Sequence, residues 1–141
     1  MIQIRPYHST DYQHLKQLYL SPNTFGGQFD EDRDAQEKID EQVASNPNSI
    51  IVAEEDGKIV GSVSIFHDKR FAWLMRFAVI DDMEKHVSEL LFKKAAEILK
   101  EAGHAQVLVY GPSADGKFSK RYEELGFTSG EAYTAHWRFL D

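Results

Sequence analysis

The stretch of sequence that decides the fold is Arg121-Tyr122-Glu123-Glu124-Leu125-Gly126-Phe127. A polar segment, Asp115-Gly116-Lys117, precedes it and predicts the start of a short helix, and Gly126 predicts its end. The residues from Phe127 to Phe139 are predicted to form a final strand region. A short helix that carries Tyr122 is therefore expected just before the last strands.

Hydrophobic periodicity predicts the elements that come earlier in the chain. Strands are predicted at Ile2–Arg5, Ile50–Ala53, Lys58–Phe66, Phe71–Ile80 and Val107–Tyr110. Helices are predicted from Asp11 through Tyr19, over Asp30–Gln42, and over Val87–Ala102 with Gly103 as its stop. Asp56-Gly57 is the strongest hairpin signal, so the three middle strands are expected to form an antiparallel meander. The order predicts one α/β domain over residues 1–141, with a mixed, mostly antiparallel central sheet and helices on both faces.

Composition narrows the classes of function. The net charge of −7 argues against a nucleic-acid partner and favours a cationic or amine substrate. The chain has no apolar run of the roughly 18 residues that a membrane span requires. The absence of cysteine excludes disulfides and thiolate metal sites, and is compatible with the cytoplasmic location that we expect. The six histidines show no metal-ligand spacing, so no metal is expected. The oligomeric state is left open, a homodimer included.

In element order and in two motifs, the chain resembles the GNAT superfamily of acetyl-CoA-dependent N-acetyltransferases. The motifs are Tyr122-Glu-Glu-Leu-Gly-Phe127 near the C-terminus and Gly103 after the long helix. The resemblance implies a GNAT-like fold over essentially the whole chain. In that fold, the strand that matches Phe71–Ile80 splays from the strand that matches Val107–Tyr110.

The resemblance also implies where acetyl-CoA would bind. The pantetheine arm would lie between the splayed strands and pair with backbone groups of Phe77, Ala78 and Val79, as an added strand does. The pyrophosphate would lie at the start of the long helix, where backbone N–H groups point outward. The residues implied there are Lys85, His86, Val87 and Ser88.

This chain departs from the family at the pyrophosphate loop, which normally has an Arg or Gln followed by two glycines. Asp82 stands where the Arg would be, and Lys85 and Val87 stand where the glycines would be. Asp81, Asp82 and Glu84 also bring negative charge, and each repulsive contact costs about 1 kcal/mol at ~4 Å in water. Two interpretations are open. Either coenzyme A binding is weakened, or these acids favour the dipole of a helix that has no ligand.

The resemblance gives Tyr122 a catalytic role, because the family Tyr lies where the thiolate leaves acetyl-CoA. A phenol with a pKa of about 10 is protonated at neutral pH and can donate to that sulfur. Packing against the sheet is the alternative role. Asp115 stands where the family often has an Asn near the cofactor, and an N-cap explains it equally well. No general base is evident, because Trp73 stands where some members have a Glu, and Glu54 reads as surface charge.

Two functional hypotheses follow. The first is an N-acetyltransferase that moves an acetyl group from acetyl-CoA to a small-molecule or peptide amine by direct attack. Its acceptor pocket would be framed by Thr24–Phe29 and by a last hairpin near Tyr133. The alternative is a catalytically inactive GNAT-fold binding or regulatory module, which the missing glycines favour. The sequence does not reveal the acceptor amine.

Overall fold

The computed structural model describes residues 1–112 and 115–141, which contain six strands and four α-helices. The strands are β1 (Gln3–Pro6), β2 (Thr24–Phe25), β3 (Ile50–Glu55), β4 (Lys58–His67), β5 (Ala72–Ile80) and β6 (Leu108–Val109). The helices are α1 (Tyr12–Leu20), α2 (Gln36–Ser45), α3 (Glu84–Glu101) and α4 (Gly116–Glu124), with 3-10 turns η1 (Ser9–Asp11) and η2 (Asp81–Met83). Residues 1–110 and 111–141 form two compact units, and each is described by itself. One domain over residues 1–141 stays a prediction.

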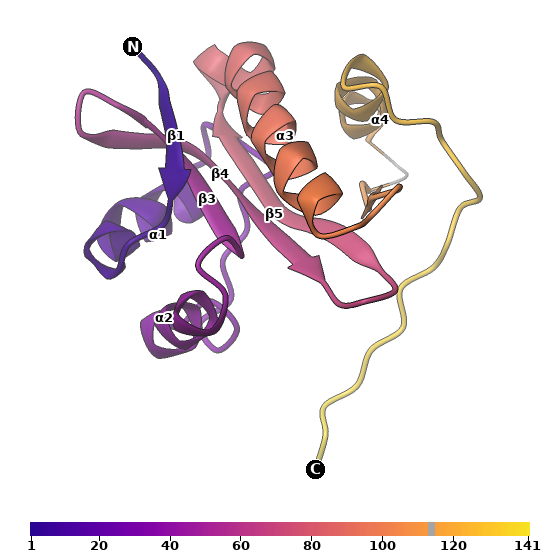
Figure 1. The fold of residues 1–141 in the computed structure, drawn as a ribbon, viewed down its shortest axis with the longest axis horizontal. Helices are drawn as coiled ribbons and strands as arrows, with labels where there is room; N and C mark the ends of the chain where they lie inside the picture. The colour runs from indigo at the N-terminus through magenta and orange to yellow at the C-terminus, as the bar shows by residue number, and fades with distance from the viewer. Residues whose placement is uncertain (113–114) are drawn as a thin grey trace. The chain divides into compact units, whose positions relative to one another are not determined.

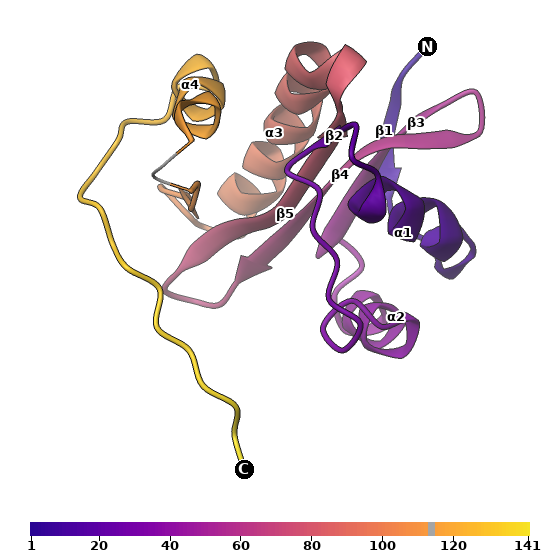
Figure 2. The same cartoon turned by 180° about the vertical axis from the view of Figure 1, so that it is seen from behind.

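The sheet is mixed and mostly antiparallel, as the sequence predicts. Its strands follow the order β1-β3-β4-β5-β2, all pairs antiparallel, and β6 joins β5 in parallel. Helix α3 lies across one face (Figure 1), and α1 lies on the opposite face, which is seen from behind in Figure 2. The α/β class with helices on both faces is confirmed.

Apolar faces of the helices hold the two layers on the sheet. On the α1 side, the buried core residues are Tyr7, Tyr12, Leu15, Leu18, Tyr19, Ile39, Ile50, Val52, Ile59 and Ala78. Helix α3 buries Val87, Leu91, Ala95 and Leu99, a stripe at helical spacing. Fully burying one such aliphatic side chain contributes about 2 kcal/mol, so both layers are held mainly by this stripe-on-sheet packing.

The two glycines that the sequence marks as helix stops end α3 and α4 in the same way. Gly103 and Gly126 have φ values of 95° and 92°, a conformation that favours glycine. After α3, His104 N–H donates to the Leu99 carbonyl at 3.0 Å, and after α4, Phe127 N–H donates to the Tyr122 carbonyl at 2.9 Å. These are Schellman caps, and both predicted helix ends are confirmed.

Other predicted boundaries move for local reasons. Helix α2 begins at Gln36 rather than Asp30, because the Asp30 side chain accepts the N–H groups of Asp32 and Arg33 and holds a turn there. Helix α3 begins at Glu84, three residues before the predicted start. The turn η1 precedes α1, and Asp11 caps no N–H group of that helix with its side chain.

The predicted final strand region from Phe127 to Phe139 is wrong. The structure gives these residues no strand, and Trp137 and Phe139 are 76% and 82% exposed. Their alternation with polar residues is typical of a strand, but a strand also needs a neighbour for its backbone groups. Among the described residues, none pairs with this segment.

Candidate functional site

The edge of β5 that faces away from β4 has two different partners. At its start, Trp73 and Leu74 pair with Leu108 and Val109 of β6. At its end, Val79 and Ile80 pair with Phe25 and Thr24 of β2, a strand that the sequence does not predict. Between Leu74 and Val79, no strand in residues 1–112 or 115–141 pairs with this edge. Along this edge, β5 is therefore paired with β6 for only two residues and with β2 for only two residues.

A β-bulge lies in this unpaired part of β5. Opposite Ser62 and Ser64 of β4, which are two residues apart, stand Ala78 and Met75, which are three apart. The extra residue is Arg76, whose φ of 49° lies in the left-handed region where glycine is usual. Such a conformation costs a non-glycine residue about 1–2 kcal/mol. A bulge bends its strand and increases the local twist, so β5 turns here from the path that β6 follows.

The bulge is also visible in the faces of the sheet that two buried residues of β5 occupy. Leu74 stands opposite Ile65, which lies on the same face of β4 as Val63 and Gly61, two and four residues earlier, and Gly61 faces α3. Phe77 alternates with Ala78, which belongs to the core on the α1 side, so Phe77 also faces α3. A regular strand would put residues 74 and 77 on opposite faces. Two buried apolar residues at this odd spacing require one extra residue between them.

The direction of the backbone groups separates the three β5 residues that the sequence singled out. Asp81 N–H donates to the Asn23 carbonyl at 2.8 Å, on the β2 side. Because these groups alternate, Val79 and Phe77 direct theirs to that same side, and Ala78 directs its groups to β4. Val79 is already paired with Phe25 there. Phe77 thus directs its backbone N–H and C=O groups to the same side of β5 as Val79, away from β4.

The Arg76 side chain fastens the bulge to the connection between α1 and α2. Its guanidinium donates to both carboxylate oxygens of Asp34, at 3.2 and 2.9 Å, and also to Gln28 Oε1. Asp34 is itself held, because its backbone carbonyl accepts the Tyr12 hydroxyl at 2.8 Å and its carboxylate accepts Asp30 N–H at 2.8 Å. The sequence alone assigned Arg76, Asp34 and Tyr12 no role at the site.

The start of α3 follows directly after β5 and η2. Met83 at the N-cap position makes no side-chain cap, and the N–H group of Glu84, the first residue of the helix, donates to the Asp81 carbonyl. Lys85 and His86 are exposed, whereas Val87 is fully buried. A Cβ on Gly61 would lie 2.7 Å from Val87 Cγ1, so Val87 fills the space that Gly61 leaves on the sheet. The bulk that replaces the family glycine therefore points into the core and leaves the outer side of the turn open.

The acidic residues that the sequence flagged lie where expected. Asp81 and Asp82 line a hollow of about 380 Å³ together with Ser21, Asn23 and Ile80. Ser88 is buried, and its hydroxyl donates to Glu84 Oε1 at 3.2 Å. The hydroxyl of Ser88 is thus engaged inside the helix, whereas Asp81 and Asp82 of η2 are exposed.

Tyr122 and Asp115 belong to the unit of residues 111–141. Asp115 is the N-cap of α4, where its side chain accepts Lys117 N–H at 3.1 Å. The Tyr122 ring packs edge-on against Phe127, with centroids 5.6 Å apart, which is the apolar contact that accompanies a Schellman cap. A Cβ on Gly111 would lie 3.2 Å from that ring. The Leu-Gly-Phe signature thereby fixes the Tyr122 side chain at the end of its helix.

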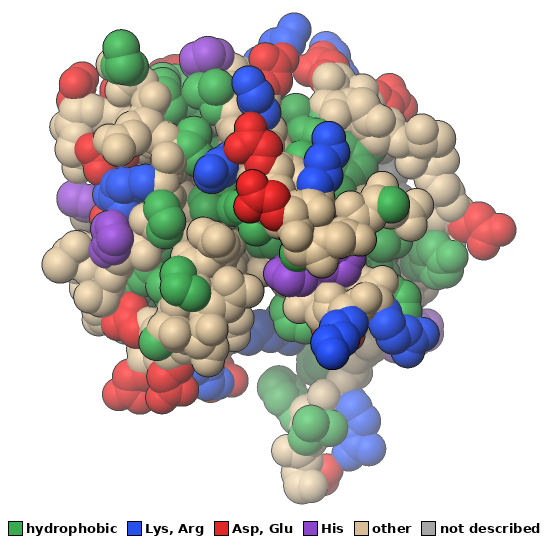
Figure 3. Space-filling view, viewed as in Figure 1, with side chains coloured by type: hydrophobic (Ala, Val, Ile, Leu, Met, Phe, Trp, Pro, Cys, Tyr) green, Lys and Arg blue, Asp and Glu red, His purple; other side chains and the backbone are tan. Residues whose placement is uncertain are grey.

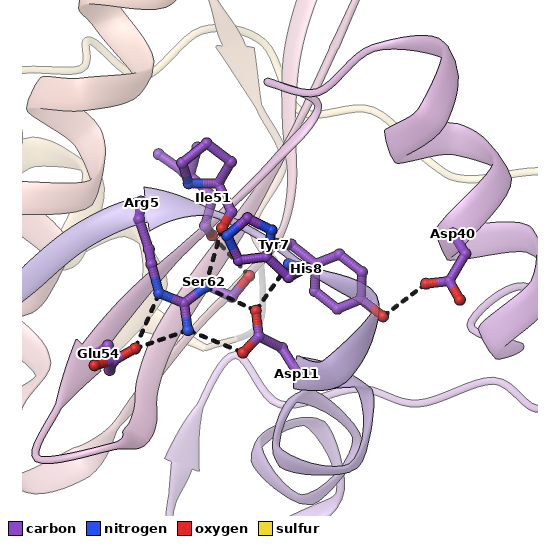
Figure 4. A network of polar contacts seen from close by, with 9 residues as sticks. Arg5, Tyr7, His8, Asp11, Asp40, Ile51, Glu54 and Ser62 are labelled. Carbon is purple, nitrogen blue, oxygen red and sulfur yellow. Dashed lines mark hydrogen bonds and ion pairs between the residues drawn. The ribbon is translucent and has the colours of Figure 1, made fainter.

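The candidates for a general base have other partners. Glu54 accepts two hydrogen bonds from Arg5, at 2.9 and 2.8 Å, and Arg5 also grips Asp11 through both carboxylate oxygens (Figure 4). The Trp73 ring stacks on Tyr110 with centroids 4.8 Å apart. Glu54 is thus part of a structural cluster.

The chain was compared with models of known protein families. The model of the acetyltransferase (GNAT) family matches residues 12–127. The chain belongs to the GNAT family. No curated protein sequence matches the chain. The GNAT fold is shared with many solved structures.

Three structures illustrate this likeness. AAC(6')-Iy, in complex with the bisubstrate analogue CoA-S-monomethyl-acetylneamine, has a TM-score of 0.75 at 18% identity, with 99% of each chain covered. The PaiA N-acetyltransferase from Thermoplasma acidophilum, in complex with coenzyme A, has 0.72 at 20%, with 87% of each chain covered. Ard1 from Thermoplasma volcanium has 0.74 at 17%, with 92% of this chain and 84% of that chain covered.

One further structure, from Pyrococcus horikoshii, has a TM-score of 0.67 at 14% identity, and this chain spans 44% of its length. At such identities these likenesses establish the fold and leave the substrate open.

Three further features of the described residues concern surface charge, metal binding and membrane spans. Over the face that carries α3, acidic and basic side chains are interspersed (Figure 3). In the part of the chain that the structure describes, no three or more His, Asp or Glu side chains gather as a metal site. Within the same residues, no helix combines the length and apolarity that a membrane crossing needs.

Proposed function

We propose that this GNAT-family chain transfers an acetyl group from acetyl-CoA to an amine acceptor. The observation that carries the proposal is the change of partner strand along one edge of β5, which pairs with β6 at Trp73 and Leu74 and with β2 at Val79 and Ile80. A pantetheine arm is an extended chain with two amides, and it can add to such an edge as a short strand does. Family membership supports acetyl transfer in general, and the amine acceptor is our inference.

The residues at the site fit the cofactor at one end better than at the other. Phe77 offers its backbone to the pantetheine arm, and Ala78 and Val79 continue that strand. Because Val79 is paired with Phe25, the arm reaches the Val79 groups only if β2 yields its place. At the start of α3, the exposed Lys85 and His86 suit phosphates, whereas the carboxylates of Asp81 and Asp82 oppose them.

The chemistry that we assign to the chain itself is modest. When bound, acetyl-CoA supplies a thioester that an amine can attack directly. Backbone N–H groups along β5 stabilise the charge that develops on the carbonyl oxygen. We assign to the Tyr122 hydroxyl the donation of a proton to the departing sulfur. The amine loses its own proton through ordered water, since neither Glu54 nor Trp73 supplies a base.

Calorimetric titration of the whole chain with acetyl-CoA tests the proposal. A dissociation constant in the micromolar range is expected, which corresponds to about 8 kcal/mol of binding free energy. No heat at millimolar cofactor would contradict it. That result would favour a second candidate, a GNAT-fold binding module without acetyl transfer, which the acidic turn Asp81–Met83 supports.

The role of Tyr122 has its own test in the Tyr122→Phe variant, assayed with a panel of amines and peptide N-termini by thiol release. Loss of the proton donor is expected to lower kcat about 100-fold and to alter the alkaline limb of the pH profile, while the Kd for acetyl-CoA and the melting temperature stay unchanged. An unchanged rate and profile would exclude Tyr122 as the acid. A cytoplasmic location stays a prediction, and the oligomeric state stays open, a homodimer included.

A further inference from the structure

One face of β4 changes from buried to exposed along its length. Ser62, Ser64 and Phe66 alternate with Ile65, which lies on the α3 side, so these three share the face that α1 packs against. Ser62 is fully buried, Ser64 is half-buried and Phe66 is 60% exposed. Helices α1 and α2 cover only part of this face, and the joined ends of β4 and β5 extend beyond them (Figure 2). The large apolar side chain thus lies in solvent and the small polar one is covered, which reverses the usual order.

Phe66 is one of five apolar side chains that adjoin one another on this face. It stands opposite Trp73 of β5, and Trp73 stands beside Leu108 of β6, so the three form one row across the sheet. Met75 lies two residues further along β5 and shares the face, and the Tyr110 ring stacks on Trp73 with centroids 4.8 Å apart. All five belong to the compact unit of residues 1–110. We call them the apolar shelf.

The area of the apolar shelf suits a small occupant. Phe66, Met75 and Tyr110 are 60%, 51% and 63% exposed, and Leu108 is 38% exposed. With about 200 Å² for a side chain of this size, the shelf presents roughly 400 Å² to solvent. A contiguous patch of this size on one chain is often functional. It is about half of the ~800 Å² that each partner of a stable protein interface buries, so a second copy of the chain is a poorer match than a small molecule.

The apolar shelf ends at the bulge of β5, beside the residues to which we assign acetyl-CoA. Met75 directly precedes Arg76, whose guanidinium donates to Asp34 and Gln28, so the connection between α1 and α2 borders the shelf there. Because each residue of a strand rises about 3.3 Å, Met75 lies within about 7 Å of Phe77 along β5. A molecule on the shelf therefore lies within a few carbon–carbon bonds of the proposed thioester.

We propose that the apolar shelf binds an aromatic ring of the amine acceptor, so that the substrates of this chain are amines with a ring a few carbon atoms from the nitrogen. The inference rests on the proposed function, because it names the class of the acceptor. Phe66, Trp73 and Tyr110 offer faces and edges on which a ring can stack. None of the five shelf residues is charged, so the shelf suits the apolar end of the acceptor and leaves its nitrogen to point along β5.

The first experiment compares two acceptors that differ only by the ring, 2-phenylethylamine and ethylamine, with thiol release as the assay. We expect kcat/KM to favour 2-phenylethylamine at least about 30-fold, because the ring leaves water on binding. Phe66→Ala and Met75→Ala should each lower that ratio about threefold or more, since both side chains lose contact with the ring. A wild-type ratio near one, or a ratio that both variants leave unchanged, would overturn the inference.

Leu20→Ala is the matched control. Leu20 lies at the end of α1, outside the apolar shelf, and is 57% exposed, nearly the same as Phe66. Its removal takes a similar exposed apolar side chain from the chain and should leave the ratio of the two acceptors unchanged. A loss equal to that of Phe66→Ala would show that the preference does not arise on the shelf.

A second readout separates this inference from the proposed function. The chain has two tryptophans, so Trp137→Phe leaves Trp73 as the single emitter. Its fluorescence is titrated with each amine, with and without coenzyme A. If the chain neither binds acetyl-CoA nor transfers acetyl, the proposed function fails and this titration still tests the shelf. A saturable change with 2-phenylethylamine but not with ethylamine supports it. Emission that neither amine changes, or that changes with protein concentration instead, contradicts it and assigns the shelf to another segment or to a second copy.

Discussion

Two arginines in this molecule make nearly the same contacts and have different consequences. Arg5 and Arg76 each present 19% of the side chain to solvent and each meet both oxygens of a buried aspartate. Arg5 lies in an ordinary strand, whereas Arg76 has a φ of 49° at a bulge. The same ion-pair chemistry thus joins two segments in both cases, and in one of them the arginine also has a left-handed backbone. Contacts alone do not distinguish the two roles.

The largest effect should come from removing either guanidinium. Arg5→Ala and Arg76→Ala each leave a buried aspartate without its main partner, which typically costs 3 kcal/mol or more, so we expect a loss of about 3 kcal/mol in the free energy of unfolding for both. Urea denaturation measures this. A loss below about 1 kcal/mol at Arg76 would show that its ion pair does not hold the bulge.

The next effect is the pH dependence of stability that arises from Asp11, which Arg5 holds together with Glu54. Burial acts to raise the pKa of Asp11, but the hydrogen bonds from Arg5 and from the backbone of His8 outweigh it and lower that pKa. The resulting stabilisation is present above the unfolded pKa of about 3.9 and is lost as the pH falls through the lower folded value. Asp11→Asn should therefore cost about 2 kcal/mol at neutral pH. The difference from wild type should shrink in acid, and a constant difference down to the lowest pH at which the chain folds would contradict this reading.

A smaller effect tests the difference between the two backbones. At position 5, glycine should be less stable than alanine by about 0.5–1 kcal/mol, because it loses more conformational freedom in a strand. At position 76, glycine should instead be more stable than alanine by about 1 kcal/mol, because it avoids left-handed strain. Melting of the four variants measures both differences. The same sign at both positions would remove the distinction between the clusters.

The smallest effect is expected at an exposed pair. Asp32 and Lys38 lie 2.7 Å apart, but their side chains are 83% and 55% exposed. Water screens such a pair, so Asp32→Asn should change the unfolding free energy by less than about 0.5 kcal/mol. This variant is a surface control beside Asp34. If Asp32→Asn lost nearly as much unfolding free energy as Asp11→Asn, burial would not determine how much each ion pair stabilises the fold.

Features that depend only on nearby residues could be predicted from the sequence, whereas features that depend on distant residues could not. The ends of α3 and α4 were predictable, because Gly103 and Gly126 act through nearby backbone groups. The bulge at Arg76 was not, since it depends on a register with β4 and on an ion pair across 42 residues. The strand predicted at Phe127–Phe139 failed for the same reason, because periodicity reports a candidate strand and says nothing of its partner.

The residues of the candidate site show the same difference between local and long-range features. The order of elements placed Phe77, Ala78 and Val79 on one strand before the long helix, and the structure has them in β5. Their roles in binding the cofactor stay predictions. The sequence did not separate Phe77 from its two neighbours, because backbone direction depends on which strands flank β5. The assignments of Tyr122 and Asp115 as catalytic and cofactor-binding residues stay predictions, although the N-cap role of Asp115 is now established.

The fit of Val87 against Gly61 has a consequence for redesign. Anyone who grafts a glycine-rich loop onto this chain by Val87→Gly alone would open a void under the helix, since position 61 has no side chain to fill it. The reciprocal change, Gly61→Ala alone, would collide with the valine. Side-chain volume must therefore be moved from position 87 to position 61 in one double variant. A glycine-rich, phosphate-binding turn can be built here only by replacing both residues together.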